Sequence, residues 1–334
     1  MQKTPVFVLC VLCAGLATAT VSDASAQTLS TGSGQAYPTK PVRFVIAFSP
    51  GGPSDILTRL VGTKLSEAMG QPFVFENRPG AGGNIAGEFV AKAPPDGYTL
   101  LMGNNSILAT NASLYKKMNF DPVKELAPVA LLASQPNILV VHPSLPVKSV
   151  KDLVALAKSR PGQLNYASSG SGAAAHLAAE LFKSSTGVSM VHIPYRGAGP
   201  ALADMLAGQC QVMFATALSV QPHIKSGRLR PLAVTTSRRS ATFPDLPTVA
   251  ETGVKGFEAT TWHGVVVTAG TPQAVIDRLN AEINKILKMP DMRERLRNQG
   301  AEIIGGTPQQ FAAYIQAEIP KWAKVIKDSG ATAD

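Results

Sequence analysis

The stretch VRFVIAFSPGGPSDILTRLVGTKLSEAM, residues 42–69, contains the local pattern that decides the fold. The β-branched and aromatic run at 42–48 is typical of a buried strand. A turn of small residues and prolines follows at 49–55. Apolar residues then recur at helical spacing, at Ile56, Leu57, Leu60, Val61, Leu65 and Met69. We therefore predict a strand, a glycine-rich turn and a helix, which together start a βα unit.

The same pattern recurs along most of the chain. Helical spacing returns in the runs Leu177 to Phe182 and Val275 to Leu287. Further short strands are predicted at residues 73–76, 99–102, 138–142, 164–167, 190–195, 212–215 and 232–235. This alternation predicts βα units with mostly parallel sheets.

Five of the predicted strands end in turns of small residues that precede helices. The turns lie at residues 49–55, 78–84, 103–106, 168–172 and 196–200. Helix starts at the carboxyl edge of a parallel sheet direct backbone N–H groups toward one crevice, an arrangement that favours anions. Because the turns fall into two clusters, before about residue 107 and after about residue 160, we predict two lobes with a cleft between them.

Two apolar passages are predicted to cross between these lobes. The first covers residues 128–134 and, after a break at Gln135-Pro136, residues 137–142; the second covers 262–268. Two crossing strands form a hinge. The predicted boundaries place residues 37–132 and 262–334 in lobe 1 and residues 133–261 in lobe 2.

The N-terminus is typical of an export leader. Lys3 precedes an apolar stretch at 6–19, and Ala24-Ser25-Ala26 supplies the small residues of a cleavage site. We predict a signal peptide at 1–26, removed on export, and a flexible Ser/Gly/Thr-rich tether at 27–36. Cleavage would leave Cys210 as the only cysteine, so no intramolecular disulfide is expected. Beyond the leader, no apolar run approaches the ~18 residues that a membrane span needs.

The net charge of +9 is compatible with nucleic acid, an anionic surface or small anions as partners. Export argues against nucleic acid, and so do the absence of a dense Lys/Arg run and an aromatic content of 6%. We interpret the charge as diffuse, which favours small anionic solutes. A generally solubilising surface explains the charge equally well.

Catalytic and cofactor motifs are missing or incomplete. No GxSxG nucleophile elbow occurs, although His176 could serve a serine of the 168–171 loop as a base. The five histidines lack metal-ligand spacing, and no phosphate-binding P-loop is present. Gly170, Gly172 and Ala175 satisfy GxGxxA, but the next strand ends in Tyr195-Arg196 and not in an acidic residue. No metal or cofactor is expected.

A carboxylate in a closed cleft requires several hydrogen-bond donors. Helix starts provide backbone donors, and Ser168, Ser169 and Ser171 add hydroxyl groups. Arg196 could add a charged contact, with a surface salt bridge as the alternative. Asp55 could accept from a ligand hydroxyl or amine, with a capping role in the first helical turn as the alternative.

Several segments of the chain form a familiar set. They are FSPGG at 48–52 with Asp55, ENRPGAGG at 76–83, PDGYTL at 95–100, YASSG at 166–170 with His176, PYRG at 194–197 with Pro200-Ala201, PDLPT at 244–248 and GTP at 270–272. Together, these motifs resemble the extracytoplasmic solute-binding receptors of tripartite tricarboxylate transporters, the Bug family. The similarity covers nearly everything from Tyr37 to the C-terminus.

The resemblance implies an α/β type II periplasmic-binding-protein fold with two doubly wound lobes. It also implies a function: a periplasmic receptor, not an enzyme, that closes on a small organic carboxylate and delivers it to a membrane permease. We expect a monomer. The resemblance implies a set of ligand-binding residues, which are Ser49, Gly52, Asp55, Ala81, Gly82, Asn105, Ser168, Ser169, Gly172, Ala173, Thr216 and His263. Arg196 joins them as the charged contact considered above. A secreted serine hydrolase and a ligand sensor without a transport role remain the alternatives.

Overall fold

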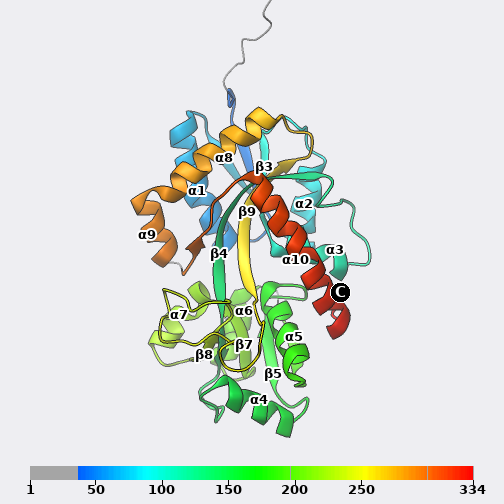
Figure 1. Ribbon diagram of the computed structural model, residues 1–334, viewed down its shortest axis with the longest axis vertical. Coiled ribbons are helices and arrows are strands. Elements are labelled where there is room, and N and C mark those ends of the chain that lie inside the picture. Colours follow the sequence, from blue (N-terminus) through cyan, green and yellow to red (C-terminus); the bar gives the residue numbers. More distant parts are fainter. Residues whose placement is uncertain (1–36, 196, 299, 334) are drawn as a thin grey trace, which may run out of the picture. The chain divides into compact units, whose positions relative to one another are not determined.

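One mixed β-sheet runs through the described part of the chain (Figure 1). The computed structural model describes residues 37–195, 197–298 and 300–333. The strand order is β2-β1-β3-β9-β4-β7-β5-β6, and β8 and β10 each pair with β4. The strands are β1 (Val42–Ile46), β2 (Phe73–Asn77), β3 (Thr99–Asn104), β4 (Leu126–Val141), β5 (Asn165–Ser168), β6 (Val191–Pro194), β7 (Val212–Thr216), β8 (Arg230–Val234), β9 (Thr260–Thr268) and β10 (Glu302–Ile303).

Helices follow most of the strands, as the alternating pattern predicted. In α1, Leu57, Val61 and Leu65 are buried at helical spacing. The helix ends at Gly70, whose φ of 70° provides the left-handed cap that glycine favours. The helices are α1 (Pro53–Met69), α2 (Asn84–Ala91), α3 (Asn111–Leu114), α4 (Val150–Ser159), α5 (Ala174–Thr186), α6 (Ala198–Leu206), α7 (Ala217–Lys225), α8 (Gln273–Lys288), α9 (Pro290–Asn298) and α10 (Pro308–Ser329), with short helices η1 (Ala81–Gly83) and η2 (Ser106–Thr110).

The sheet has two parallel parts joined by two antiparallel strands. In lobe 1, β1 pairs in parallel with β2 and β3, and in lobe 2, β5 pairs in parallel with β6 and β7. The crossing strands β4 and β9 pair with each other, while β9 also pairs with β3, and β4 with β7 and β8. The described residues therefore form two α/β lobes joined by crossing strands, as predicted.

The predicted break at Gln135-Pro136 is wrong, because β4 runs without interruption from Leu126 to Val141. Pro136 is tolerated because the strand changes partners there. Its register partner is Thr260, the first residue of β9, and the next residue, Asn137, pairs with Thr216 of β7. A proline has no N–H to donate, so a position where one ladder ends and another begins suits it.

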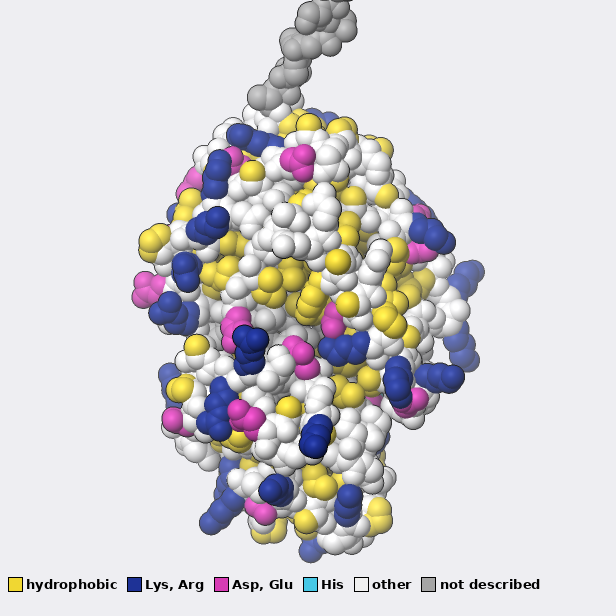
Figure 2. All heavy atoms as spheres, in the orientation of Figure 1, with side chains coloured by type: hydrophobic (Ala, Val, Ile, Leu, Met, Phe, Trp, Pro, Cys, Tyr) yellow, Lys and Arg dark blue, Asp and Glu magenta, His cyan; other side chains and the backbone are white. Residues whose placement is uncertain are grey.

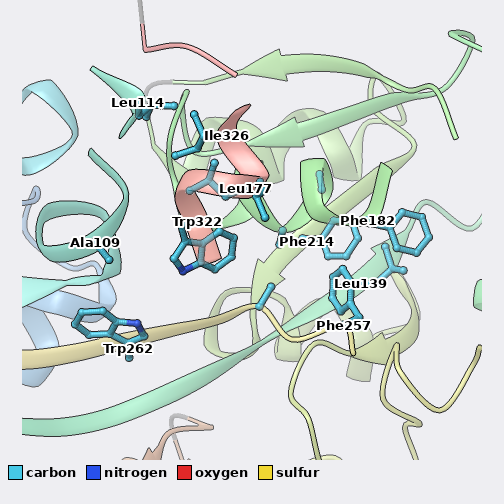
Figure 3. Packing of buried hydrophobic residues seen from close by; sticks show 14 of the residues in the cluster. Ala109, Leu114, Leu139, Leu177, Phe182, Phe214, Phe257, Trp262, Trp322 and Ile326 are labelled. Carbon is cyan, nitrogen blue, oxygen red and sulfur yellow. The ribbon is translucent and has the colours of Figure 1, made fainter. Parts of the chain in front are cut away.

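The largest buried core cluster is continuous between the two lobes (Figure 3). Trp322 and Ile326 of α10 belong to this cluster together with Leu114 of lobe 1 and Leu177 of α5. In lobe 2 the cluster continues through an aromatic group of Phe182, Phe214 and Phe257, whose ring centroids are 5.5 to 6.3 Å apart. The C-terminal helix therefore stabilises both lobes.

A buried carboxylate fixes α10 to the crossing strand β9. Glu318 accepts hydrogen bonds from the indole N–H groups of Trp262, at 3.1 Å, and Trp322, at 2.8 Å. Its other oxygen accepts from Lys321 Nζ at 2.8 Å. A buried charge is tolerated when its oxygens have donors of this kind, so the contact sets the position of α10 on β9.

The remaining expectations about the chain as a whole have mixed outcomes. Figure 2 shows basic side chains scattered over one face among acidic ones, in agreement with a diffuse charge. Cys210 is buried and forms no disulfide among the described residues. Within the same residues, no helix is both long and apolar enough to cross a bilayer. The predicted signal peptide, the tether and Arg196 lie outside the described residues.

Candidate functional site

Asp55 holds the first helix-start loop in place. Its Oδ2 accepts a hydrogen bond from the backbone N–H of Gly51 at 3.0 Å, and its Oδ1 accepts from Asn77 at 3.0 Å and from Arg59 at 2.9 and 3.0 Å. Burial raises the pKa of Asp55, but the hydrogen bonds from Arg59, Gly51 and Asn77 outweigh it and leave the pKa below 3.8. These contacts favour a structural role over a contact with ligand.

The start of α1 retains free backbone donors. The N-cap residue, Gly52, provides no side-chain hydrogen bond to the first turn. Pro53 at the first helical position has no N–H, so the N–H groups of Ser54 and Asp55 are the ones without a partner inside the helix. Ser49, in the same loop, is exposed. This helix start can therefore accept an anion through its backbone.

The second loop of lobe 1 has an unusual backbone. Gly80, Ala81, Gly82 and Gly83 all have positive φ angles, and Ala81 is the only residue other than glycine with a positive φ in the described part of the chain. Asn111 stabilises this turn by donating to the Gly82 carbonyl at 3.1 Å. The positive φ of Ala81 is strained because alanine has a Cβ atom, and strained positions of this kind occur at binding sites. The ligand contacts of Ala81 and Gly82 stay predictions.

The end of β3 lies beside the crossing strand β9. Asn104 is the register partner of His263, and both are buried. His263 Nε2 lies 3.0 Å from the Ser54 hydroxyl at the start of α1. Burial lowers the pKa of His263 to about 4, so its imidazole is neutral at pH 7. Asn105 follows Asn104 and is fully buried. The structure therefore brings His263 to the start of α1, and Asn105 is the residue after the register partner of His263.

In lobe 2, the loop after β5 is closed by Ser168. The Ser168 hydroxyl donates to the Gly170 carbonyl, at 3.1 Å, and the Gly170 N–H lies 3.2 Å from it. His192 Nε2 is 2.7 Å from the same hydroxyl. Ser168 is fully buried, so it cannot serve as an accessible nucleophile. The hydroxyl has a structural role in the loop.

The next residues of this loop are held by the start of α5. The N–H of Gly172 donates to His176 Nδ1 at 3.0 Å, and the N–H of Ala173 donates to the Gly170 carbonyl at 3.2 Å. Both amides predicted to bind ligand therefore have partners inside the loop. His176 cannot use the same nitrogen as a base for a serine. By contrast, the half-buried Ser169 hydroxyl has no partner among the described residues and is the better placed donor.

Two histidines that contact this loop, His176 and His192, are stacked with Tyr166. The His176 and His192 rings are 4.0 Å apart and nearly parallel, and the Tyr166 ring is stacked 4.8 Å from His192 and 6.4 Å from His176. Burial and the charge of Lys183 lower the pKa of His176 to about 4. A neutral His176 retains the Nδ1 lone pair that accepts from Gly172, so its charge state and the shape of the loop are linked.

We expect acid to destabilise the protein between pH 6.5 and 4. In this range the unfolded chain binds protons at positions 176 and 263, whereas the folded chain does not. The stabilisation is complete above pH 6.5 and is lost as the pH falls toward 4, by up to ~1.4 kcal/mol per pH unit and histidine. Urea unfolding at several pH values in this range gives the free energy of unfolding as a function of pH. This free energy should fall less steeply with decreasing pH in His176→Gln than in the wild type, and still less steeply when His263→Gln is added. An unchanged pH dependence in both variants would refute the lowered pKa values of these two histidines.

Residues from the two lobes meet at Gly172. A Cβ atom placed on Gly172 would lie 2.0 Å from Cδ2 of Leu114 in lobe 1. Thr216, the N-cap of α7, is half-buried, and its hydroxyl lies 2.7 Å from that of Ser219. The lobe 2 loop is thus in contact with lobe 1, whereas Thr216 lies at the start of a separate helix.

Three residues beside these loops were not predicted as site residues. Ser54 contacts His263, His192 contacts Ser168, and Gln135 lies on β4 next to β9. In the sequence, Ser54 is one of several small residues in a turn, and Gln135 was interpreted as part of a break. Only the register of β4 and β9 reveals the position of Gln135.

Other features of the described residues do not contribute to this site. A surface pocket of about 470 Å³ lies against α2 and is lined by Arg43, Phe89 and Lys92, away from the helix-start loops. No cluster of His, Cys, Asp or Glu suited to a metal ion is present in the part of the chain that the structure describes.

Two α/β lobes, two crossing strands and uncapped helix starts beside those strands define the class of two-lobed solute-binding proteins. The chain belongs to the tripartite tricarboxylate transporter family of receptors, whose sequence pattern it matches over residues 57–331. The family consists of solute-binding receptors. Both the predicted family and the predicted type II periplasmic-binding-protein fold are thereby confirmed.

Solved structures of similar proteins agree with this assignment. The chain is 42% identical to Rpa4515 of R. palustris, described with adipate, with a TM-score of 0.83 and coverage of 89% of this chain and 100% of the other. The periplasmic binding protein BugD is 34% identical, with a TM-score of 0.80 and coverage of 89% of this chain and 100% of the other. MatC of Rhodopseudomonas palustris, with bound malate, is 32% identical, with a TM-score of 0.79 and coverage of 87% of this chain and 100% of the other.

Proposed function

We propose that this protein is a periplasmic receptor that captures a small organic carboxylate between its lobes and delivers it to a tripartite tricarboxylate transporter permease. The main observation in support of this proposal is that helices α1 and α5 both start without a side-chain cap. Such helix starts accept a carboxylate through backbone N–H groups without requiring a buried cation.

The surrounding contacts support the same function. Asp55 and His176 each hold a backbone N–H of their loop, so the loops are ordered before ligand arrives. Order of this kind lowers the entropy cost of binding. The solved relatives with adipate and malate support a carboxylate, BugD supports the periplasm, and family membership supports the permease. Closure would be a population shift toward the state in which both lobes contact the ligand.

The test begins with a thermal-shift screen of organic acids, because a tight ligand raises the apparent stability. Calorimetry then compares the best ligand on three variants. We expect Ser169→Ala to weaken binding about tenfold or more, since a hydrogen bond to a charged group is lost, and Ser169→Pro to weaken it further because the N–H is lost as well. Ser184→Ala, an exposed serine on α5, is the matched control and should bind as the wild type does. Undiminished affinity in Ser169→Pro would count against the proposal.

A further inference from the structure

Four buried polar atoms without a hydrogen-bond partner lie on three side chains near the crossing strands. They are Asn105 Nδ2 and Oδ1, Gln135 Oε1 and His263 Nδ1; in the described part of the chain, one other buried side-chain atom, Asn111 Oδ1, shares this condition. Asn105, Gln135 and His263 are 0%, 4% and 2% exposed. Buried polar groups are nearly always paired, so a group of unpaired ones indicates a partner that binds from outside the chain.

The strand register places two of these side chains, Gln135 and His263, on one face of the sheet, and Asn105 directly follows the register partner of His263. His263 pairs with Asn104 on one side and with Ala133 on the other. Gln135 pairs with Thr261, two residues from His263 on β9, so Gln135 and His263 share one face of the sheet. That face carries the start of α1, because His263 Nε2 contacts Ser54.

The opposite face of β9 is occupied by other contacts. Trp262, between Thr261 and His263, is directed toward α10, where its indole donates to Glu318 and its ring packs on Phe311. Side chains alternate between the two faces along β9. Trp262 therefore lies on the apolar face that packs against α10, whereas His263 lies with Gln135 of β4 on the opposite, polar face. The unpaired atoms of Gln135 and His263 lie on the side that carries the start of α1.

These groups are uncharged. Burial holds the pKa of His263 near 4, and no charged side chain among the described residues pairs with Asn105, Gln135 or His263. Asp55 and Arg59, the ion pair of the adjacent loop, are paired with each other. Asn105 offers an NH₂ donor group and a carbonyl acceptor whichever way its amide is turned. A hydroxyl group both donates and accepts and complements such a set, whereas a carboxylate only accepts and would meet unpaired amide oxygens.

We propose that Gln135, with Asn105 and His263, forms a subsite for a hydroxyl group on the carbon chain of the ligand. The ligands are then hydroxycarboxylic acids, whose carboxylate lies at the helix starts and whose hydroxyl lies at the crossing strands. This inference rests on the proposed function and specifies the substrate class for the same site. Gln135 is a specificity-determining residue of that subsite.

The first experiment measures calorimetric affinities for three matched pairs: butyrate with 3-hydroxybutyrate, succinate with malate, and adipate with 3-hydroxyadipate. We expect the hydroxylated member to bind about tenfold tighter in at least one pair, the effect of one well-made hydrogen bond. Equal affinities in all three pairs, or tighter binding of the plain acids, overturn the subsite. If none of the six acids binds, the proposed function itself is in doubt, so the two failures are distinguishable.

The second experiment uses Gln135→Met, a change close in volume. Removal of an unpaired buried polar group should leave the melting temperature of the ligand-free protein unchanged or raised, while the preference for the hydroxylated acid falls about tenfold. A retained preference, or a lower melting temperature, overturns the role of Gln135, since a structural residue would destabilise the protein when replaced. Gln135→Leu repeats the test with a branched side chain. The matched control is Ser134→Ala, the adjacent residue, which pairs with Trp262 and should keep the full preference.

Discussion

Replacement of Gly172 by alanine is expected to weaken carboxylate binding about tenfold or more. Gly172 has a φ of +76°, a region that costs a residue with a Cβ atom ~1–2 kcal/mol. The added Cβ would also lie 2.0 Å from Cδ2 of Leu114, so the loop or the leucine must move. Because Leu114 belongs to lobe 1 and Gly172 to lobe 2, a shift here would keep the lobes from approaching. Calorimetry with the best ligand of the acid screen measures the effect.

Two further variants separate the causes of this loss. Gly187→Ala, at the other end of α5, has a φ of +68° but no heavy atom within 4 Å of the added Cβ. It should lower the stability by ~1 kcal/mol and leave the affinity unchanged. Leu114→Ala combined with Gly172→Ala removes the contacted atom and should recover part of the affinity, although the cavity lowers stability. If Gly172→Ala alone binds within threefold of the wild type, the contact between the lobes has no role in binding.

The fold was predictable from the sequence wherever local chemistry decided the structure. The β-branched run at 42–48 and the helical spacing of Leu57, Val61 and Leu65 determine β1 and α1 through burial of one face. The continuity of β4 through Pro136 was not predictable. A proline normally ends a strand, and the change of partner strand that permits it depends on Thr260 and Thr216, which are distant in sequence. The lobe boundaries at 132/133 and 261/262 remain predictions.

The candidate site was predictable in its loops but not in its individual roles. The small-residue turns mark the helix starts because glycine permits the positive φ angles observed at Gly51, Gly82 and Gly172. Which side chains face the ligand and which hold the loop depends on pairings across the fold. Asp55 and Ser168 fit a ligand contact by residue type, yet their hydrogen bonds are made within the protein.

The largest expected change in stability comes from Gly264→Ala in the crossing strand β9. Gly264 pairs with Gly103 of β3 and Leu131 of β4, so it lies in the middle of the sheet. An added Cβ would lie 2.3 Å from Phe311 and 2.9 Å from the backbone carbonyl oxygen of Ala130. The phenyl ring could move, whereas the Ala130 carbonyl belongs to the backbone of the long strand β4 and moves only with it. We expect the free energy of unfolding to fall by about 3 kcal/mol or more, at the upper end of the range for overpacked cores.

Urea unfolding provides the measurement, and a second glycine provides the control. Gly199 lies in the first turn of α6 with no atom within 4 Å of an added Cβ, so the same substitution there should leave the stability unchanged or raise it by up to ~1 kcal/mol. Phe311→Leu added to Gly264→Ala should recover only part of the loss, because the Ala130 carbonyl contact remains. Full recovery would assign the whole effect to the aromatic ring, and an unchanged stability of Gly264→Ala would mean that β4 and β9 are not packed as closely as described.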